Sequence, residues 1–137
     1  LHGGAAPCRV PGCGWRAVLI TGAPGAGKSD LALRLIGRGW RLVADDYTHV
    51  IASGGGLYAV APATIAGRIE ARGVGIVPAC TRGVTRLALV VELSDQVPER
   101  LPEPETRLIG GVPLPLLRLR GFEASAVEKV AAALARL

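Results

Sequence analysis

The sequence predicts an α/β fold in which a strand leads through a phosphate-binding loop into a helix. Two observations carry this prediction. Residues 22–29 read Gly-Ala-Pro-Gly-Ala-Gly-Lys-Ser and match the P-loop pattern G-x-x-x-x-G-K-[ST] at every defined position. An apolar run at 17–21 precedes the loop and an amphipathic segment at 30–36 follows it, which is the strand, loop and helix order that the motif requires.

The length and charge of the chain limit the classes of protein to consider. A chain of 137 residues suits one domain, so we expect residues 1–137 to share a single core of Val, Leu, Ile and Ala. The net charge of +5 is spread along the chain, which is typical of a solvated basic surface or of attraction to phosphate or an acidic partner. Few aromatic residues and no basic helix argue against a nucleic-acid partner.

Cysteine usage and hydropathy bear on the compartment. Cys8, Cys13 and Cys80 form neither an even disulfide set nor a metal-binding C-x-x-C pair, so we expect a reducing, cytoplasmic location and read the three as core or loop thiols. The sequence has no apolar run near 18 residues and no signal peptide, which indicates neither a membrane span nor secretion.

The remaining elements are predicted from periodicity and turn residues. Before the P-loop we expect a short strand, a turn and a strand ending at Thr21, and after it a short helix capped by Gly39. Residues 62–68 are expected to form a loop or a short helix. Further strands are expected at 40–44, in a hairpin of 47–51 with 57–60, at 87–93 as the central strand, and at 106–109 and 116–119. The C-terminal helix is expected to start at Ser125 with Glu128 completing a capping box.

The spacing of the P-loop follows from what a polyphosphate requires. Its anionic oxygens need many donors in a small volume, which backbone N–H groups at the start of a helix supply. Lys28 is expected to reach the β- and γ-phosphates, and the Ser29 hydroxyl is a candidate Mg²⁺ ligand. The expected nucleotide-binding residues of the loop are Gly22, Ala23, Pro24, Gly25, Ala26, Gly27, Lys28 and Ser29.

Two adjacent acids follow the strand predicted at 40–44. Seventeen positions separate Lys28 from Asp45, enough for one helix and one returning strand. If that strand lies beside the P-loop strand, Asp45 reaches the phosphate site. Two successive acids at this place favour a functional role over that of a turn residue.

These motifs together resemble the catalytic domain of bacterial HPr kinase/phosphorylase. Besides the P-loop, the resemblance rests on His-Gly at 2–3, on Leu-Val-Ala-Asp-Asp at 42–46 and on Ile-Glu-Ala-Arg-Gly-Val-Gly-Ile at 69–76. It covers nearly the whole chain, which resembles a short form without the family's separate N-terminal domain. The segment before the P-loop is longer than is usual in the family, and the segment 78–86 is shorter. The resemblance implies an α/β fold of HPr kinase type, a mixed sheet with a P-loop helix and a C-terminal helix.

The resemblance also implies roles for the acids. Asp45 would accept the proton of the attacking serine hydroxyl and return one in the reverse reaction. Glu70 would complete the Mg²⁺ shell with Ser29, its alternative being a surface pairing with a neighbouring arginine. Asp46 is either an auxiliary charge near the metal or a structural hydrogen-bond acceptor.

Basic residues complete the implied site. Arg72 would hold phosphate oxygens or orient Glu70. Arg100 falls where the family places an arginine used in the chemistry, with Arg107 as its rival. His2 is either coupled to Asp45 or a surface residue near a chain end. His49 is expected to face solvent from its strand.

The function expected from the resemblance is that of a Mg²⁺- and ATP-dependent protein serine kinase acting on the phosphocarrier HPr or a related carrier. The reverse reaction, in which phosphate removes the phosphoryl group and pyrophosphate forms, is implied as well, and so is a hexameric assembly. Two alternatives stay open. One is a small-metabolite P-loop kinase, for which the chain shows no arginine-rich lid; the other is a nucleotide-binding regulator without turnover.

Overall fold

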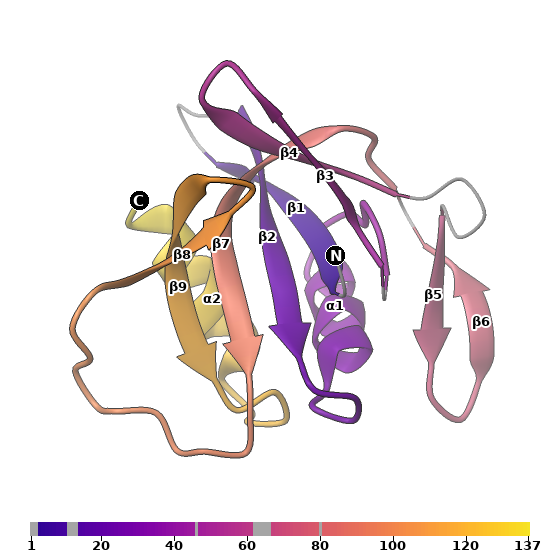
Figure 1. Cartoon of the computed structure of the whole chain (residues 1–137). Helices are drawn as coiled ribbons and strands as arrows, with labels where there is room; N and C mark the ends of the chain where they lie inside the picture. The colour runs from indigo at the N-terminus through magenta and orange to yellow at the C-terminus, as the bar shows by residue number, and fades with distance from the viewer. Residues whose placement is uncertain (1–2, 11–13, 46, 62–66, 80) are drawn as a thin grey trace.

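The structure is a computed structural model and describes residues 3–10, 14–45, 47–61, 67–79 and 81–137. Among these residues, two strands precede the first helix, and seven strands separate it from the second helix (Figure 1). They are β1 (Gly4–Val10), β2 (Gly14–Gly22), α1 (Lys28–Gly37), β3 (His49–Ser53), β4 (Gly56–Val60), β5 (Arg68–Ala71), β6 (Gly75–Pro78), β7 (Thr85–Leu93), β8 (Glu105–Ile109), β9 (Val112–Leu119) and α2 (Ala126–Ala135).

Seven of the nine described strands form a mixed sheet with β7 at its centre. β2 runs parallel to β7 and pairs with its residues 87–93, and β9 runs parallel to it and pairs with residues 90–93. β4 pairs antiparallel with the amino end of β7. β1 pairs antiparallel with β2, and the hairpins β3–β4 and β8–β9 extend the sheet. The near-continuous apolar sequences of β2 and β7 fit strands that are covered on both faces, so the prediction of residues 87–93 as the central strand is confirmed.

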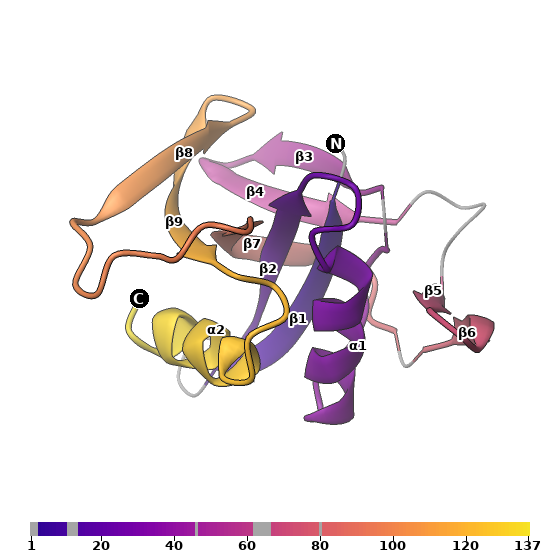
Figure 2. The same cartoon turned by 90° about the horizontal axis from the view of Figure 1, so that it is seen from below.

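Both helices lie on one face of this sheet, as Figure 2 shows. The larger core fills the space between them and the sheet, with Ile20, Val91, Leu35 and Val130 among its buried members. A smaller core on the opposite face includes Leu19, Leu57 and Leu114 under the two hairpins. The predicted mixed sheet with a P-loop helix and a C-terminal helix is therefore confirmed. No helix in the described part of the chain is long and apolar enough to cross a bilayer.

The β5–β6 hairpin forms a separate two-stranded sheet at the side of the molecule (Figure 1). It is attached through the buried Ile69, which belongs to the core beneath α1. Its turn carries Gly73 and Gly75 with positive φ, and open space surrounds both within this chain. These glycines are thus explained by the turn they form, rather than by close packing of the chain against them.

The segment 40–44 differs from the regular strand expected there. It lies against β1 as an irregular edge in which Val43 N–H donates to Ala5 O at 2.9 Å and Ala5 N–H donates to Ala44 O at 2.8 Å. Isolated bridges join it to Ala5 and, through Leu42, to Thr81. Its apolar side chains are buried like those of a core strand. On the side away from β1, its backbone bonding includes the hydrogen bond from Arg82 N–H to Leu42 O. The segment still runs antiparallel to β1 and hence in the same direction as β2.

The predicted capping box of α2 does not form. Ser125 is the N-cap residue, as expected, but its side chain makes no capping hydrogen bond. The pKa of Glu128 is lowered, first by the bond its carboxylate accepts from its own backbone N–H and then by the Arg38 guanidinium. Arg38 is the C-cap residue of α1, and its guanidinium lies 2.9 Å from the Glu128 carboxylate. Glu128 therefore joins the ends of the two helices instead of closing the first turn of its own.

The exposed Gly37 at the end of α1 offers a test of helix stability. Replacement by Ala is expected to raise the free energy of unfolding by about 0.4 to 1 kcal/mol, because it restricts the unfolded chain. A Cβ at this position meets nothing within 4 Å and the backbone is helical. Urea denaturation followed by circular dichroism measures the change, and a loss of stability would contradict it. Gly39, with φ 92°, is the control, since Ala there is expected to destabilise.

Candidate active site

The P-loop joins β2 to α1 at the edge of the sheet where the parallel strands end (Figure 1). Gly27 caps the helix with φ 101° and ψ 23°, a left-handed conformation that favours glycine, and no side chain caps the first turn. The backbone N–H groups of that turn are therefore left for a ligand, and the helix directs its positive end toward them. The geometry suits an anion with several oxygens.

Lys28 is folded back over the loop that precedes it. Its ammonium group donates to Gly22 O at 2.8 Å and to Ala23 O at 3.3 Å. Both acceptors are neutral carbonyls of the loop, so the charge of this lysine is not neutralised by an acid among the described residues. The cation is thus available to an anionic ligand within the same loop.

A hydrogen-bonded chain links three of the predicted residues. The Ser29 hydroxyl donates to Asp45 Oδ1 at 2.8 Å, and the backbone N–H of Glu70 donates to Asp45 Oδ2 at 3.1 Å. Asp45 is 8% exposed. One buried carboxylate therefore connects the first turn of α1, the end of the segment 40–44 and the β5–β6 hairpin.

The topology explains how Asp45 reaches Ser29. Direct pairing of the segment 40–44 with the P-loop strand was one way to bring Asp45 to the phosphate site, but β1 lies between the two. Two antiparallel pairings in succession restore the direction of the chain, so β2 and the segment 40–44 end at the same edge. The carboxylate therefore arrives beside the first turn of α1 even though its segment is not the neighbour of β2.

The side chains of Glu70 and Arg72 are exposed on the β5–β6 hairpin. Among the ion pairs of the described residues, none joins the Glu70 carboxylate to Arg68 or Arg72, so the surface pairing considered for it is not formed. Arg72 lies in the turn of the hairpin, and within the same described set it has no bond to the P-loop. The structure thus brings the Glu70 backbone to Asp45 but joins neither side chain to the loop.

The two candidate arginines of the C-terminal half have different surroundings. Arg100 is exposed in the segment 94–104, which leads away from α1 past β9 in both views (Figures 1 and 2). Arg107 on β8 donates to Glu92 at 2.9 Å, and Arg118 of β9 pairs with the same carboxylate. Arg107 is therefore held in an ion-pair cluster, and the structure does not join Arg100 to the P-loop. His2 and Asp46, the other two predicted site residues, lie outside the described residues.

A segment that the sequence reasoning missed packs against the P-loop from the opposite side. It follows β9 and comprises residues 120–123 (Figure 2). A Cβ built on Gly121 would overlap Ala26 O, and one built on Gly27 would lie 3.1 Å from Phe122 Cζ. The only phenylalanine of the chain, placed directly after a predicted strand and a glycine, was the available signal.

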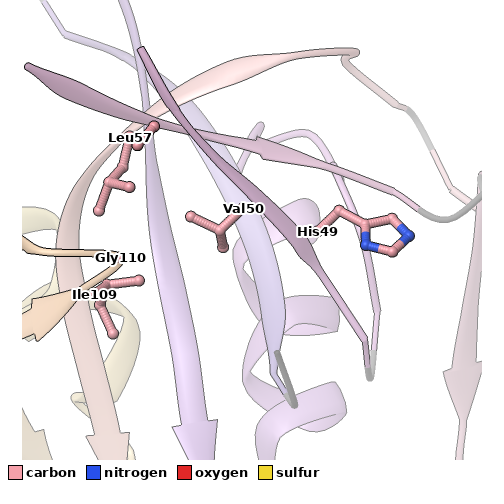
Figure 3. Close-up of a pocket in the computed structure, with 6 residues that line it drawn as sticks. His49, Val50, Leu57, Ile109 and Gly110 are labelled. Carbon is pink, nitrogen blue, oxygen red and sulfur yellow. The ribbon is translucent and has the colours of Figure 1, made fainter. Parts of the chain in front are cut away.

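A hollow of about 400 Å³ lies on the face of the sheet away from the helices; Figure 3 draws the residues that line it. Its lining residues are His49, Val50, Ala52, Leu57, Ile109 and Gly110. The ring of the exposed His49 points away from the other labelled residues. The lining is mainly apolar and contains no lysine, arginine or helix N-terminus. This hollow is therefore not suited to a polyphosphate, and the P-loop edge remains the candidate site. The prediction that His49 faces solvent is confirmed.

The residues at that edge fit a magnesium nucleotide. The loop supplies unpaired backbone donors and a cation, and the Ser29 hydroxyl and Asp45 carboxylate offer the oxygen ligands that Mg²⁺ prefers. A buried carboxylate beside the loop can also accept a proton from a hydroxyl group that approaches it. The arrangement is therefore able to support phosphoryl transfer.

Comparisons with known proteins agree on one family. The family model for the HPr Serine kinase C-terminal domain matches residues 6–115. HPr kinase/phosphorylase of Aromatoleum aromaticum is 41% identical over 119 residues, covering 71% of this chain and 36% of the relative. The Lacticaseibacillus casei protein is 35% identical over 111 residues, covering 72% of this chain and 35% of the relative. The chain thus spans about a third of the length of these curated relatives.

A solved structure supports the same fold. The Hpr(Ser) kinase/phosphatase from Coxiella burnetii superposes with a TM-score of 0.78 at 24% sequence identity, covering 99% of this chain and 87% of that one. The family match extends over the P-loop, the segment that ends at Asp45 and the β5–β6 hairpin. The chain therefore belongs to the HPr serine kinase C-terminal domain family.

Proposed function

We propose that this protein is a Mg²⁺-dependent protein serine kinase that transfers the γ-phosphoryl group of ATP to the phosphocarrier HPr or a related carrier. The observation that carries the proposal is the buried Asp45 carboxylate bonded to Ser29 beside the P-loop lysine. Membership of the HPr serine kinase C-terminal domain family supports the choice of a protein serine hydroxyl as acceptor.

The residues of the site divide into those that bind phosphate, those that bind the metal and those that support the chemistry. The backbone of the P-loop and Lys28 bind the β- and γ-phosphates, with Arg72 as a further phosphate contact. Ser29 and Glu70 are the proposed metal ligands, with Asp46 beside them. A bound Mg²⁺ would neutralise charge on the phosphate oxygens. His2 and Arg100 keep their proposed supporting roles in the chemistry.

In the forward direction the serine oxygen forms the new bond to the γ-phosphorus as the bond to the β–γ bridging oxygen breaks, and ADP leaves. Asp45 takes the serine proton. In the reverse direction an oxygen of inorganic phosphate forms a bond to the phosphoserine phosphorus, and pyrophosphate results. As the serine oxygen leaves, Asp45 passes to it the proton that the attacking phosphate gives up. One carboxylate thus serves both directions.

A carrier phosphorylation assay in both directions tests the proposal. Incubation with HPr and labelled ATP·Mg²⁺ is expected to place label on a carrier serine, and removal of Mg²⁺ by EDTA is expected to abolish the transfer. Phospho-HPr with inorganic phosphate is expected to yield pyrophosphate. A protein that binds ATP but labels no carrier, even when the chain is lengthened toward the size of its relatives, would contradict the kinase proposal. The hexameric assembly that the family resemblance implies, and the cytoplasmic location expected from the sequence, remain part of this proposal.

A further inference from the structure

The segment that follows β9 is fixed against the P-loop by several independent contacts. Gly121 lies so close to Ala26 O that no side chain fits between them. Arg34 of α1 donates to the carbonyl oxygens of Gly121 and, at 3.2 Å, of Glu123. The Glu123 carboxylate is bonded in turn to Lys129 at 2.6 Å. The backbone on both sides of Phe122 is therefore held in one position relative to the loop.

The Phe122 ring projects from this fixed backbone and is largely open to solvent. Its side chain is 65% exposed although it lies at the P-loop. The ring atoms nearest to a Cβ built on Gly27 are Cζ at 3.1 Å and the two Cε atoms at 3.3 Å. The ring thus approaches the loop with its far end, so contact with Gly27 does not cover its two faces. Contact between the apolar ring and water is unfavourable, and a flat ligand that covers a face of the ring would remove part of that contact.

The two sides of the P-loop differ in chemistry. Asp45 and the β5–β6 hairpin flank it on the side of β1, where the proton acceptor lies. Phe122 flanks it on the side of β9, two strands beyond β2 in the sheet. A triphosphate whose reacting end lies near Asp45 directs its nucleoside end toward the opposite flank. The exposed aromatic ring is therefore found on the side where a base would lie.

We propose that Phe122 is the stacking platform for the nucleobase of the nucleotide bound by this P-loop. The inference rests on the proposed use of a nucleoside triphosphate and adds a base subsite to it. Stacking on an aromatic face contributes affinity without selecting strongly among bases. Gly121 and Arg34 are the positioning residues of this subsite, because they hold the ring at the height of the loop.

The test compares ATP with inorganic tripolyphosphate, which has the same phosphate chain but no base. Both are titrated with Mg²⁺ by isothermal calorimetry into the unaltered chain and into Phe122→Ala and Phe122→Leu. Both substitutions are expected to weaken ATP binding about ten- to a hundredfold and tripolyphosphate binding less than about twofold. Leu retains an apolar contact with Gly27, so it separates stacking from simple packing. Leu108→Ala, at a 70% exposed apolar position on β8, is the matched control and should change neither affinity.

A second readout uses fluorescence. Phe122→Trp is expected to keep the affinity for ATP. The fluorescence of the new tryptophan, after subtraction of the signal from Trp15 and Trp40, is expected to fall when ATP binds but not when tripolyphosphate binds. Equal losses of affinity for ATP and for tripolyphosphate would show that the ring only shapes the loop. Unchanged ATP affinity in Phe122→Leu would show that the base does not stack on the ring. Either outcome overturns this inference while the proposed kinase stands. An unaltered chain that binds tripolyphosphate but not ATP would overturn both.

Discussion

Replacement of Asp45 by Asn is expected to slow transfer of phosphate to the carrier by about 10²- to 10⁴-fold, the range contributed by a positioned general base. The amide has nearly the same shape but cannot take up the serine proton. It can still accept a hydrogen bond from Ser29 or from the Glu70 N–H through one oxygen, in place of the two bonds that the carboxylate accepts. ATP binding through the P-loop is expected to persist, because the loop backbone and Lys28 are untouched.

The measurement is the initial rate of phosphoserine formation on HPr at saturating ATP·Mg²⁺, with ATP affinity determined separately by calorimetry. The reverse reaction, followed as pyrophosphate release, is expected to fall in parallel. Glu103→Gln is the control, since it makes the same carboxylate-to-amide change on an exposed residue of the segment 94–104. A variant at Asp45 that transfers phosphate at the unaltered rate would mean that another group accepts the proton.

The second large effect is expected from Gly121→Ala. A Cβ at this position would overlap the carbonyl oxygen of Ala26 and would also come within 3.1 Å of Leu93 Cδ1. Backbone cannot yield as a flexible side chain does, so the P-loop and the segment 120–123 must separate. Overpacking of this kind is expected to lower the free energy of unfolding by about 1 to 3 kcal/mol. Because the displaced contact is the P-loop itself, tripolyphosphate affinity should fall as well.

Chemical denaturation and calorimetric titration with tripolyphosphate measure the two parts of this prediction. Gly83→Ala is the matched control, since a Cβ there meets nothing within 4 Å and the backbone does not have positive φ. It is expected to leave both stability and affinity nearly unchanged. A Gly121→Ala variant as stable as the control, with unaltered tripolyphosphate affinity, would show that the packing of this segment on the loop is loose.

Local patterns were enough to predict most of the elements. The P-loop with its strand and helix, the β3–β4 hairpin around Gly54 and Gly55, and the central strand β7 all depend on residues that are neighbours in sequence. Turn residues and apolar periodicity encode such features directly. The same holds for α2, whose start at Ser125 was predicted even though its capping bond is replaced by the pairing of Glu128 with Arg38.

Features that depend on pairing between distant segments could not be obtained in this way. Nothing in the local sequence of β1 indicates that it lies between β2 and the segment 40–44. The condition under which Asp45 was expected to reach the phosphate site, direct pairing of its segment with the P-loop strand, is therefore not met, although Asp45 does reach the first turn of α1. The contact of Phe122 with Gly27 likewise joins residues that are far apart in the chain. Arg100 was matched to the family by its position in the sequence, but that position alone does not determine where an exposed segment leads in space.

The bond from the Glu70 amide to Asp45 makes a single backbone hydrogen informative about the state of the whole site. A hydrogen held by a buried carboxylate exchanges slowly with deuterated solvent, and it is released when that carboxylate turns to another partner. The Glu70 cross-peak in an amide spectrum of the isotope-labelled chain therefore reports, without an added probe group, when Asp45 is engaged elsewhere.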